Sequence, residues 1–135
     1  MLLLSTIRQS ADFQLISLNF SKETKVESLV KSMEQKCHYK SSGNELILLP
    51  KLSGTWIVLF CDEVNLPEVD RYETQVVIQF LRQMITQKGF WHPEKGVWVS
   101  LQNIQFVGAC NPSDMAGRKT MTDRFLDYCT VIMVD

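Results

Sequence analysis

Four short apolar segments divide the chain, and the stretches between them carry apolar residues at helical spacing. The second and fourth segments are nearly continuous apolar runs rich in β-branched residues. That pattern is typical of parallel strands covered on both faces. All four segments are therefore predicted to be strands: Phe13–Asn19, Trp56–Cys61, Ile104–Cys110 and Thr130–Val134.

Helices are predicted between these strands. Lys22–Gln35 can be capped by Ser21, and Arg71–Lys88 is followed by Gly89, at the position where helices favour glycine. Apolar residues recur every three or four positions in both. The expected inward residues are Val26, Leu29, Val30 and Met33 in the first, and Val76, Val77, Phe80, Leu81, Met84 and Ile85 in the second.

Shorter elements complete the pattern. Thr122–Tyr128 is predicted to be a short helix, and Met1–Ser10 the last part of another. Cys37–Pro50 and Phe90–Leu101 each hold a turn signal between β-prone arms, which predicts two β-hairpins. Strands that alternate with helices indicate an α/β fold with a mostly parallel sheet flanked by helices, here with two inserted β-hairpins.

Composition narrows the class of protein. The 135 residues suit one domain, and 45% hydrophobic residues allow a buried core. A net charge of -1 argues against a nucleic-acid surface built on bulk charge and gives no polybasic membrane patch. The apolar runs are too short to cross a bilayer. The four cysteines and two histidines lack zinc-site spacing. Cys61 and Cys110 lie inside apolar runs, where a free cysteine behaves as a small hydrophobic residue, so we expect a reduced intracellular protein.

Candidate chemistry lies where the strands end, because ligands bind beyond the carboxyl ends of parallel strands. Asp62 and Glu63 follow the second strand. Asp62 can hold magnesium, usually through water, and Glu63 can orient and deprotonate an attacking water. This is the Walker B pattern, although a solvated strand end would look similar. Asn111 follows the next strand and could hydrogen-bond a phosphate and the water, or could simply begin an Asn-Pro turn.

Two further features bear on this chemistry. Arg124, in the predicted short helix, could reach a phosphate on a neighbouring module, or could pair with Asp123 or Asp127 on the surface. No G-x-x-x-x-G-K-[ST] sequence occurs in the 135 residues. The 135 residues thus include those that would hydrolyse a nucleotide, but they do not include the loop that would bind its phosphates.

Several runs make the chain resemble the AAA+ modules of dynein heavy chains, and most of all the third module of the cytoplasmic ones. They are LFCDEVNLPEVDRY and TQVVIQFLRQM between Leu59 and Met84, GFW, WVSL, IQFVGACNP and GRKTMTDRFL further on, and LSTIRQSADFQLISLNFS at the start. The resemblance implies a single partial AAA+ core over residues 1–135. It would begin just after the phosphate-binding loop and lack the small helical subdomain.

The same resemblance implies roles for particular residues. Asp62 and Glu63 match the Walker B pair, with Asp62 as the magnesium and nucleotide residue and Glu63 as the catalytic base. Asn111 matches the first sensor, which contacts nucleotide and water, and Arg124 matches the arginine finger that points at the preceding module. The hairpins match two family inserts. Glu73 departs from the usual glycine, and Ser113–Ala116 replaces a proline-rich turn.

The resemblance also implies cofactors, partners and location. ATP or ADP and Mg²⁺ would bind in the complete module. The partners would be neighbouring AAA modules, a second heavy chain, dynein intermediate and light chains, and microtubules, in the cytoplasm and on the microtubule cytoskeleton, with no nucleic acid and no membrane. In this family the third module hydrolyses ATP slowly and controls the main hydrolytic site of the ring, which drives stepping on microtubules.

Three functions stay open from the sequence. The chain could be part of a hydrolysing module, part of a non-catalytic structural or allosteric module, or an unrelated α/β interaction domain. By itself, we expect the chain to turn over no ATP and to bind it weakly, because most phosphate contacts come from backbone amides of the loop. We also expect marginal stability or association with a neighbour, because the resemblance implies a missing strand between Ile104–Cys110 and Thr130–Val134.

Overall fold

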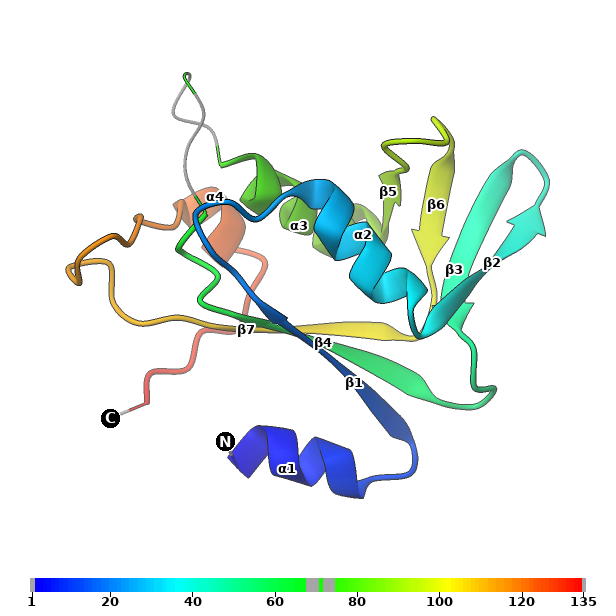
Figure 1. The fold of residues 1–135 in the computed structure, drawn as a ribbon, viewed down its shortest axis with the longest axis horizontal. Helices are drawn as coiled ribbons and strands as arrows, with labels where there is room; N and C mark the ends of the chain where they lie inside the picture. Colours follow the sequence, from blue (N-terminus) through cyan, green and yellow to red (C-terminus); the bar gives the residue numbers. More distant parts are fainter. Residues whose placement is uncertain (1, 68–70, 72–74, 135) are drawn as a thin grey trace.

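The computed structural model describes residues 2–67, 71 and 75–134, and it arranges them around two sheets (Figure 1). The elements follow one another as strands and helices in rough alternation, as the apolar pattern predicts. In chain order they are α1 (Leu2–Gln9), β1 (Phe13–Asn19), α2 (Val26–Glu34), β2 (Cys37–Ser42), β3 (Glu45–Pro50), β4 (Trp56–Asp62), α3 (Val76–Gln87), β5 (Gly89–Trp91), β6 (Trp98–Leu101), β7 (Ile104–Ala109) and α4 (Asp123–Leu126).

The first sheet has the strand order β1-β4-β7, and both pairings are parallel. Three of the four predicted strands are therefore confirmed, with ends that differ by one residue at most. Parallel neighbours cannot be joined by a tight turn, so helices and hairpins fill the connections between them. All three carboxyl ends consequently meet at one edge of the sheet.

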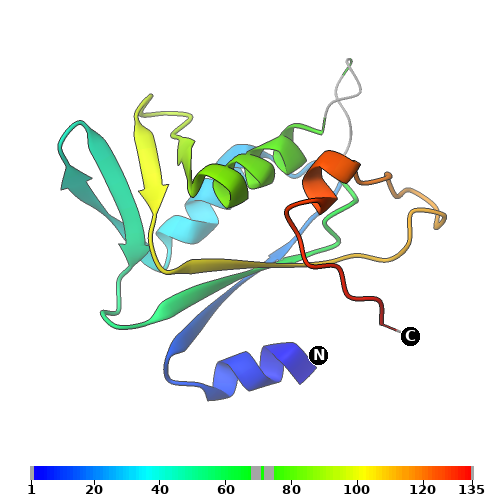
Figure 2. The same cartoon turned by 180° about the vertical axis from the view of Figure 1, so that it is seen from behind.

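Helices lie on both faces of this sheet. α2 and α3 cover one face and α1 the other, as the two opposite views show (Figures 1 and 2). The main core lies on the α2–α3 side. There, alternate strand residues such as Ile16, Leu59 and Cys61 meet the apolar faces of the two helices. The α/β architecture expected of an AAA+ large-subdomain fragment is confirmed.

The second sheet is built from the two predicted hairpins. β2 pairs with β3 and β5 with β6 in antiparallel fashion, and a parallel pairing of β3 with β6 joins them in the order β2-β3-β6-β5. The sequence predicts each hairpin, but it does not predict that the two hairpins pair with each other to form one sheet. Because β3 has a partner on both sides, the apolar run Leu46–Leu49 is an interior arm rather than an open edge.

Helix ends differ from the prediction. α2 begins after Lys25, which makes no side-chain cap bond. Ser21 instead accepts a hydrogen bond from the Glu23 amide in the preceding turn, so its predicted capping role is wrong. At the end of α3 the left-handed residue is Lys88, with φ of 50°, and not Gly89. Gly89 opens β5, where the reason for glycine is close packing.

The inward face of the helices is largely as predicted. In α3, however, Val76 is exposed and Ile78 is buried, so the inward face of the helix is formed by Val77, Ile78, Leu81 and Met84. α4 covers only the middle of the predicted Thr122–Tyr128 helix. Residues 72–74 of the predicted Arg71–Lys88 helix, and with them the departure at Glu73, lie outside the described residues.

The predicted strand Thr130–Val134 is not formed. The side chains from Val131 to Val134 are 60–88% exposed, and no strand is assigned there. A strand needs ladder bonds to a neighbour, and among the described residues none pairs with this segment.

Cys110 also differs from expectation: it lies exposed at the end of β7. Within the described part of the chain, no helix has the length and apolar character needed to cross a membrane.

Candidate functional site

The candidate site is the carboxyl edge of the first sheet. β4 is the central strand, and its last residue, Asp62, lies in register between Asn19 of β1 and Ala109 of β7. The Phe20 amide donates a hydrogen bond of 2.9 Å to the Asp62 carbonyl, which extends the β1–β4 contact past the strand ends. The Asp62 carboxylate thus lies at a fixed point of this edge, partly exposed.

Glu63 turns the chain out of the sheet in an unusual backbone conformation. Its φ is 57°, in the left-handed region that few non-glycine residues adopt. Two hydrogen bonds hold the turn: the Glu63 amide donates to Asp62 Oδ1 at 2.9 Å, and the Val64 amide donates to the Ala109 carbonyl at 3.2 Å. Such strain persists where surrounding contacts fix the backbone, and it is frequent at functional sites.

Asn111 is brought to the same edge by a second asparagine. Asn65 is 2% exposed, and its Nδ2 donates a 2.9 Å hydrogen bond to the carbonyl of Asn111. This bond joins the segment after β4 to the segment after β7 and fixes the backbone of Asn111, whose residue remains exposed. Asp62, Glu63 and Asn111 are therefore neighbours on one edge, as predicted from strand order.

Arg118 is a member of this site that the residue pattern does not predict. Its Nη1 donates to Glu63 Oε2 and, at 3.1 Å, to Asn65 Oδ1. The side chains of Arg118 and Glu63 are 11% and 28% exposed. The hydrogen bond and the charge of Arg118 lower the pKa of Glu63, and the same pair raises the pKa of Arg118.

The sequence gives one weak signal for Arg118. It lies in the GRKT stretch that begins at Gly117. This stretch contributes to the family resemblance, but the resemblance assigns no role to Arg118. Fifty-five positions separate Arg118 from Glu63, and nothing in local spacing links them. Only the return of the chain past β7 places the guanidinium against the carboxylate.

Arg124 is exposed on α4, while the adjacent Phe125 is buried in the core cluster. Within the described residues, the Arg124 side chain forms no hydrogen bond or ion pair with Asp123 or Asp127. It also forms none with Asp62, Glu63 or Asn111, so no such contact connects it to the other predicted site residues.

The acidic pair suits magnesium only in combination with other ligands. Among residues 2–67, 71 and 75–134, no group of three His, Cys, Asp or Glu side chains is placed to hold a metal ion. Mg²⁺ usually takes one or two carboxylates and completes its shell with water and phosphate oxygens. One strand-end carboxylate at Asp62 fits that arrangement and does not fit a cage made by protein alone.

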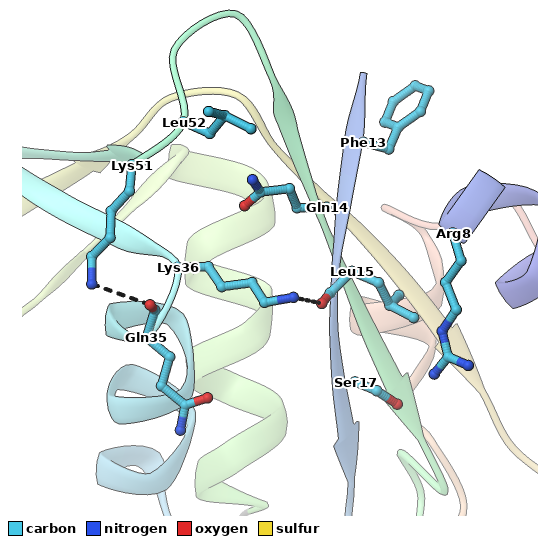
Figure 3. A pocket seen from close by; sticks show the side chains of 9 residues that line it. All are labelled: Arg8, Phe13, Gln14, Leu15, Ser17, Gln35, Lys36, Lys51 and Leu52. Carbon is cyan, nitrogen blue, oxygen red and sulfur yellow. Dashed lines mark hydrogen bonds between the residues drawn. The ribbon is translucent and has the colours of Figure 1, made fainter. Parts of the chain in front are cut away.

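A separate hollow lies at the outer edge of β1 (Figure 3). Its volume is about 640 Å³, and none of the predicted site residues lines it. Lys36 Nζ donates to the Leu15 carbonyl at 2.7 Å across it, and Lys51 Nζ donates to the Gln35 carbonyl at 3.1 Å. Lysines on an open strand edge discourage strand pairing, so this hollow is explained by protection of the edge.

Comparison with known proteins identifies the family. A family model described as the P-loop containing dynein motor region matches residues 2–135. Along its whole length the chain is 48% identical to the cytoplasmic dynein heavy chain of Dictyostelium discoideum, and 47% identical to those of Paramecium tetraurelia and Drosophila melanogaster. It spans 3% of the length of each of these relatives.

These similarities explain the arrangement at the sheet edge. A P-loop AAA family implies nucleotide binding, and the parallel β1-β4-β7 sheet with acids after its central strand is consistent with that class. The match covers nearly all of the chain, so it does not depend on one motif. The chain belongs to the dynein heavy chain family and comes from its AAA motor region.

Proposed function

We propose that this chain forms part of an ATP-hydrolysing AAA+ module of a dynein heavy chain. The observation that carries the proposal is the meeting of Asp62, Glu63 and Asn111 at one edge of a parallel sheet, tied together by the Asn65–Asn111 hydrogen bond. Two acids and an amide at the ends of adjacent strands match the chemistry of nucleotide hydrolysis.

Each residue has a distinct role in this proposal. Glu63 accepts a proton from the attacking water, which requires its carboxylate to be ionised and unpaired when the water is in place. The Asn111 amide orients the water and a phosphate oxygen, since it can donate and accept and does not titrate. Asp62 holds magnesium through water; when bound, that ion neutralises charge on the phosphates.

Arg124 acts outside the module. Its exposed position on α4, without an ion pair among the described residues, suits an arginine that meets the phosphates of a neighbouring module. In the complete polypeptide we place the chain in the third module of a ring of AAA modules, driving or gating movement along microtubules in the cytoplasm. A heavy-chain dimer with intermediate and light chains would be its assembly.

A second function is a non-catalytic module that binds nucleotide, or nothing, and serves as a structural and allosteric spacer. The pairing of Glu63 with Arg118 favours this alternative, because a carboxylate held by a cation is a poor base. The two functions differ in whether Glu63 matters for turnover.

The test is Glu63→Gln in a complete dynein heavy chain that carries these 135 residues, with the other modules of the ring inactivated by substitution. Hydrolysis at this module should fall by about 10²-fold or more, because an amide cannot accept the proton. Glu45→Gln is the matched control, since Glu45 is exposed at the start of β3. Unchanged turnover in Glu63→Gln would overturn the role of Glu63 as the base, and turnover at the background level in the unsubstituted module, with normal ATP binding, would support the non-catalytic alternative.

A further inference from the structure

We propose that Arg118 is a lock on Glu63: it holds the carboxylate in an ion pair that must open before the module can hydrolyse nucleotide. The inference rests on the proposed role of Glu63 as the base. Its basis is the contact of Arg118 Nη1 with Glu63 Oε2, made from a segment that lies between β7 and α4.

The backbone around Glu63 is fixed, so the lock must open through side chains. The Glu63 amide is held by Asp62 and the Val64 amide by Ala109, on either side of the left-handed turn. Repacking this turn would break both bonds. Release of the carboxylate therefore requires rotation of the Glu63 side chain or a shift of the Arg118 guanidinium.

Arg118 has a second partner that makes such a release feasible. Its Nη1 also donates to Asn65 Oδ1, and the Lys119 amide donates to the Asn65 carbonyl at 3.0 Å. When Glu63 departs, the guanidinium keeps an acceptor on a residue that is itself buried. This arrangement avoids leaving a largely covered cation without a partner, which would be costly.

The locked state is unsuited to proton abstraction. One carboxylate oxygen of Glu63 is occupied by the guanidinium, whereas a general base needs a free oxygen within hydrogen-bond reach of the water whose proton it takes. A nucleotide triphosphate brings several phosphate oxygens to the same edge. These give the guanidinium a competing acceptor of higher charge, so nucleotide itself can open the lock.

The test is Arg118→Met in the same complete heavy chain, with the other modules inactivated. Because the free enzyme is the locked form, kcat/KM for ATP should rise roughly threefold to tenfold. Arg118→Lys, a point charge without the planar fork, should raise kcat/KM at least about twofold.

Lys119→Met is the matched control, because it removes a neighbouring positive charge and keeps the backbone bond to Asn65. It should leave kcat/KM for ATP unchanged. A fall or no change in kcat/KM for Arg118→Met would overturn the lock, and if that variant fails to fold, the kcat/KM of Arg118→Lys is judged by the same criterion. If Glu63→Gln itself leaves turnover intact, the base assignment fails. If it abolishes turnover while both Arg118 variants lose activity, only the lock fails.

Discussion

Two regions of the molecule each hold a glutamate with a lowered pKa: the carboxyl edge of the first sheet, and the contact between α2 and the second sheet. The second region, formed by Glu34, Tyr39 and His92, is called the second-sheet joint. The groups that lower the pKa differ between the two regions. Glu63 is held by the guanidinium of Arg118. Glu34, at the end of α2, accepts a 2.5 Å hydrogen bond from the Tyr39 hydroxyl and lies 3.4 Å from His92 Nε2. The permanent cation of Arg118 lies at an open strand end, where it can leave Glu63 for an incoming anion. The phenol of Tyr39 and the imidazole of His92 are packed between α2 and the second sheet and hold these elements together.

His92 lies at the centre of the second-sheet joint and contacts each of its parts. Its Nδ1 accepts hydrogen bonds from the backbone amides of Glu94 and Lys95, at 3.2 and 3.1 Å, so the ring proton of the neutral form lies on Nε2 and faces Glu34. The Tyr39 ring meets the imidazole edge-on. The joint therefore connects α2, β2 and the β5–β6 turn, and we expect its residues to affect stability rather than chemistry.

The largest effect on folding is expected for His92→Ala. This change empties a buried site and leaves two backbone amides without their acceptor, so the free energy of unfolding should fall by about 2–4 kcal/mol. Urea unfolding of the 135-residue chain measures it. His38→Ala is the control, because His38 is exposed on β2. Equal losses in the two variants would show that His92 does not hold the joint.

Gly89→Ala should come next. An added Cβ would lie 2.5 Å from the Val99 carbonyl oxygen and 2.6 Å from the Trp98 ring, and the backbone oxygen cannot give way without disturbing the β5–β6 pairing. We expect a loss of about 1–3 kcal/mol, as for other overpacked sites.

Gly108→Ala is the matched substitution in the first sheet. Its Cβ would meet only Val64 Cγ1 at 3.8 Å and the Cys61 carbonyl at 3.9 Å, which are ordinary contacts. Thermal melting of both variants sharpens the contrast between the sheets. A larger drop for Gly108→Ala than for Gly89→Ala would contradict the observed packing.

Tyr39→Phe should have a smaller effect than His92→Ala or Gly89→Ala, about 1 kcal/mol, because it removes one hydrogen bond and preserves the ring. The difference should depend on pH. The lowered pKa of Glu34, whose largest cause is Tyr39, adds stability above the unfolded value of about 4.3, and this is lost as pH falls through the folded pKa. The gap between the two proteins in melting temperature should narrow below about pH 4. A gap that stays constant would mean that the Tyr39 hydroxyl does not act through the ionised carboxylate of Glu34.

The elements that local pattern decides are the ones that the sequence predicts best. Apolar runs and helical spacing predict β1, β4, β7, α2 and α3, and turn signals between β-prone arms predict both hairpins. Strand order then placed Asp62, Glu63 and Asn111 on one edge, because the carboxyl ends of parallel strands meet there. It failed at Thr130–Val134, where a β-prone composition found no partner strand among the described residues.

The amino-acid sequence by itself determined the alternation of elements, the acids after the central strand and the membership of a motor family, because these depend on residue types at short spacing. Only the tertiary structure decided the union of the two hairpins through β3 and β6, and the pairing of Arg118 with Glu63. Both join segments more than fifty positions apart, and such contacts are set by how the whole chain packs, not by any local preference.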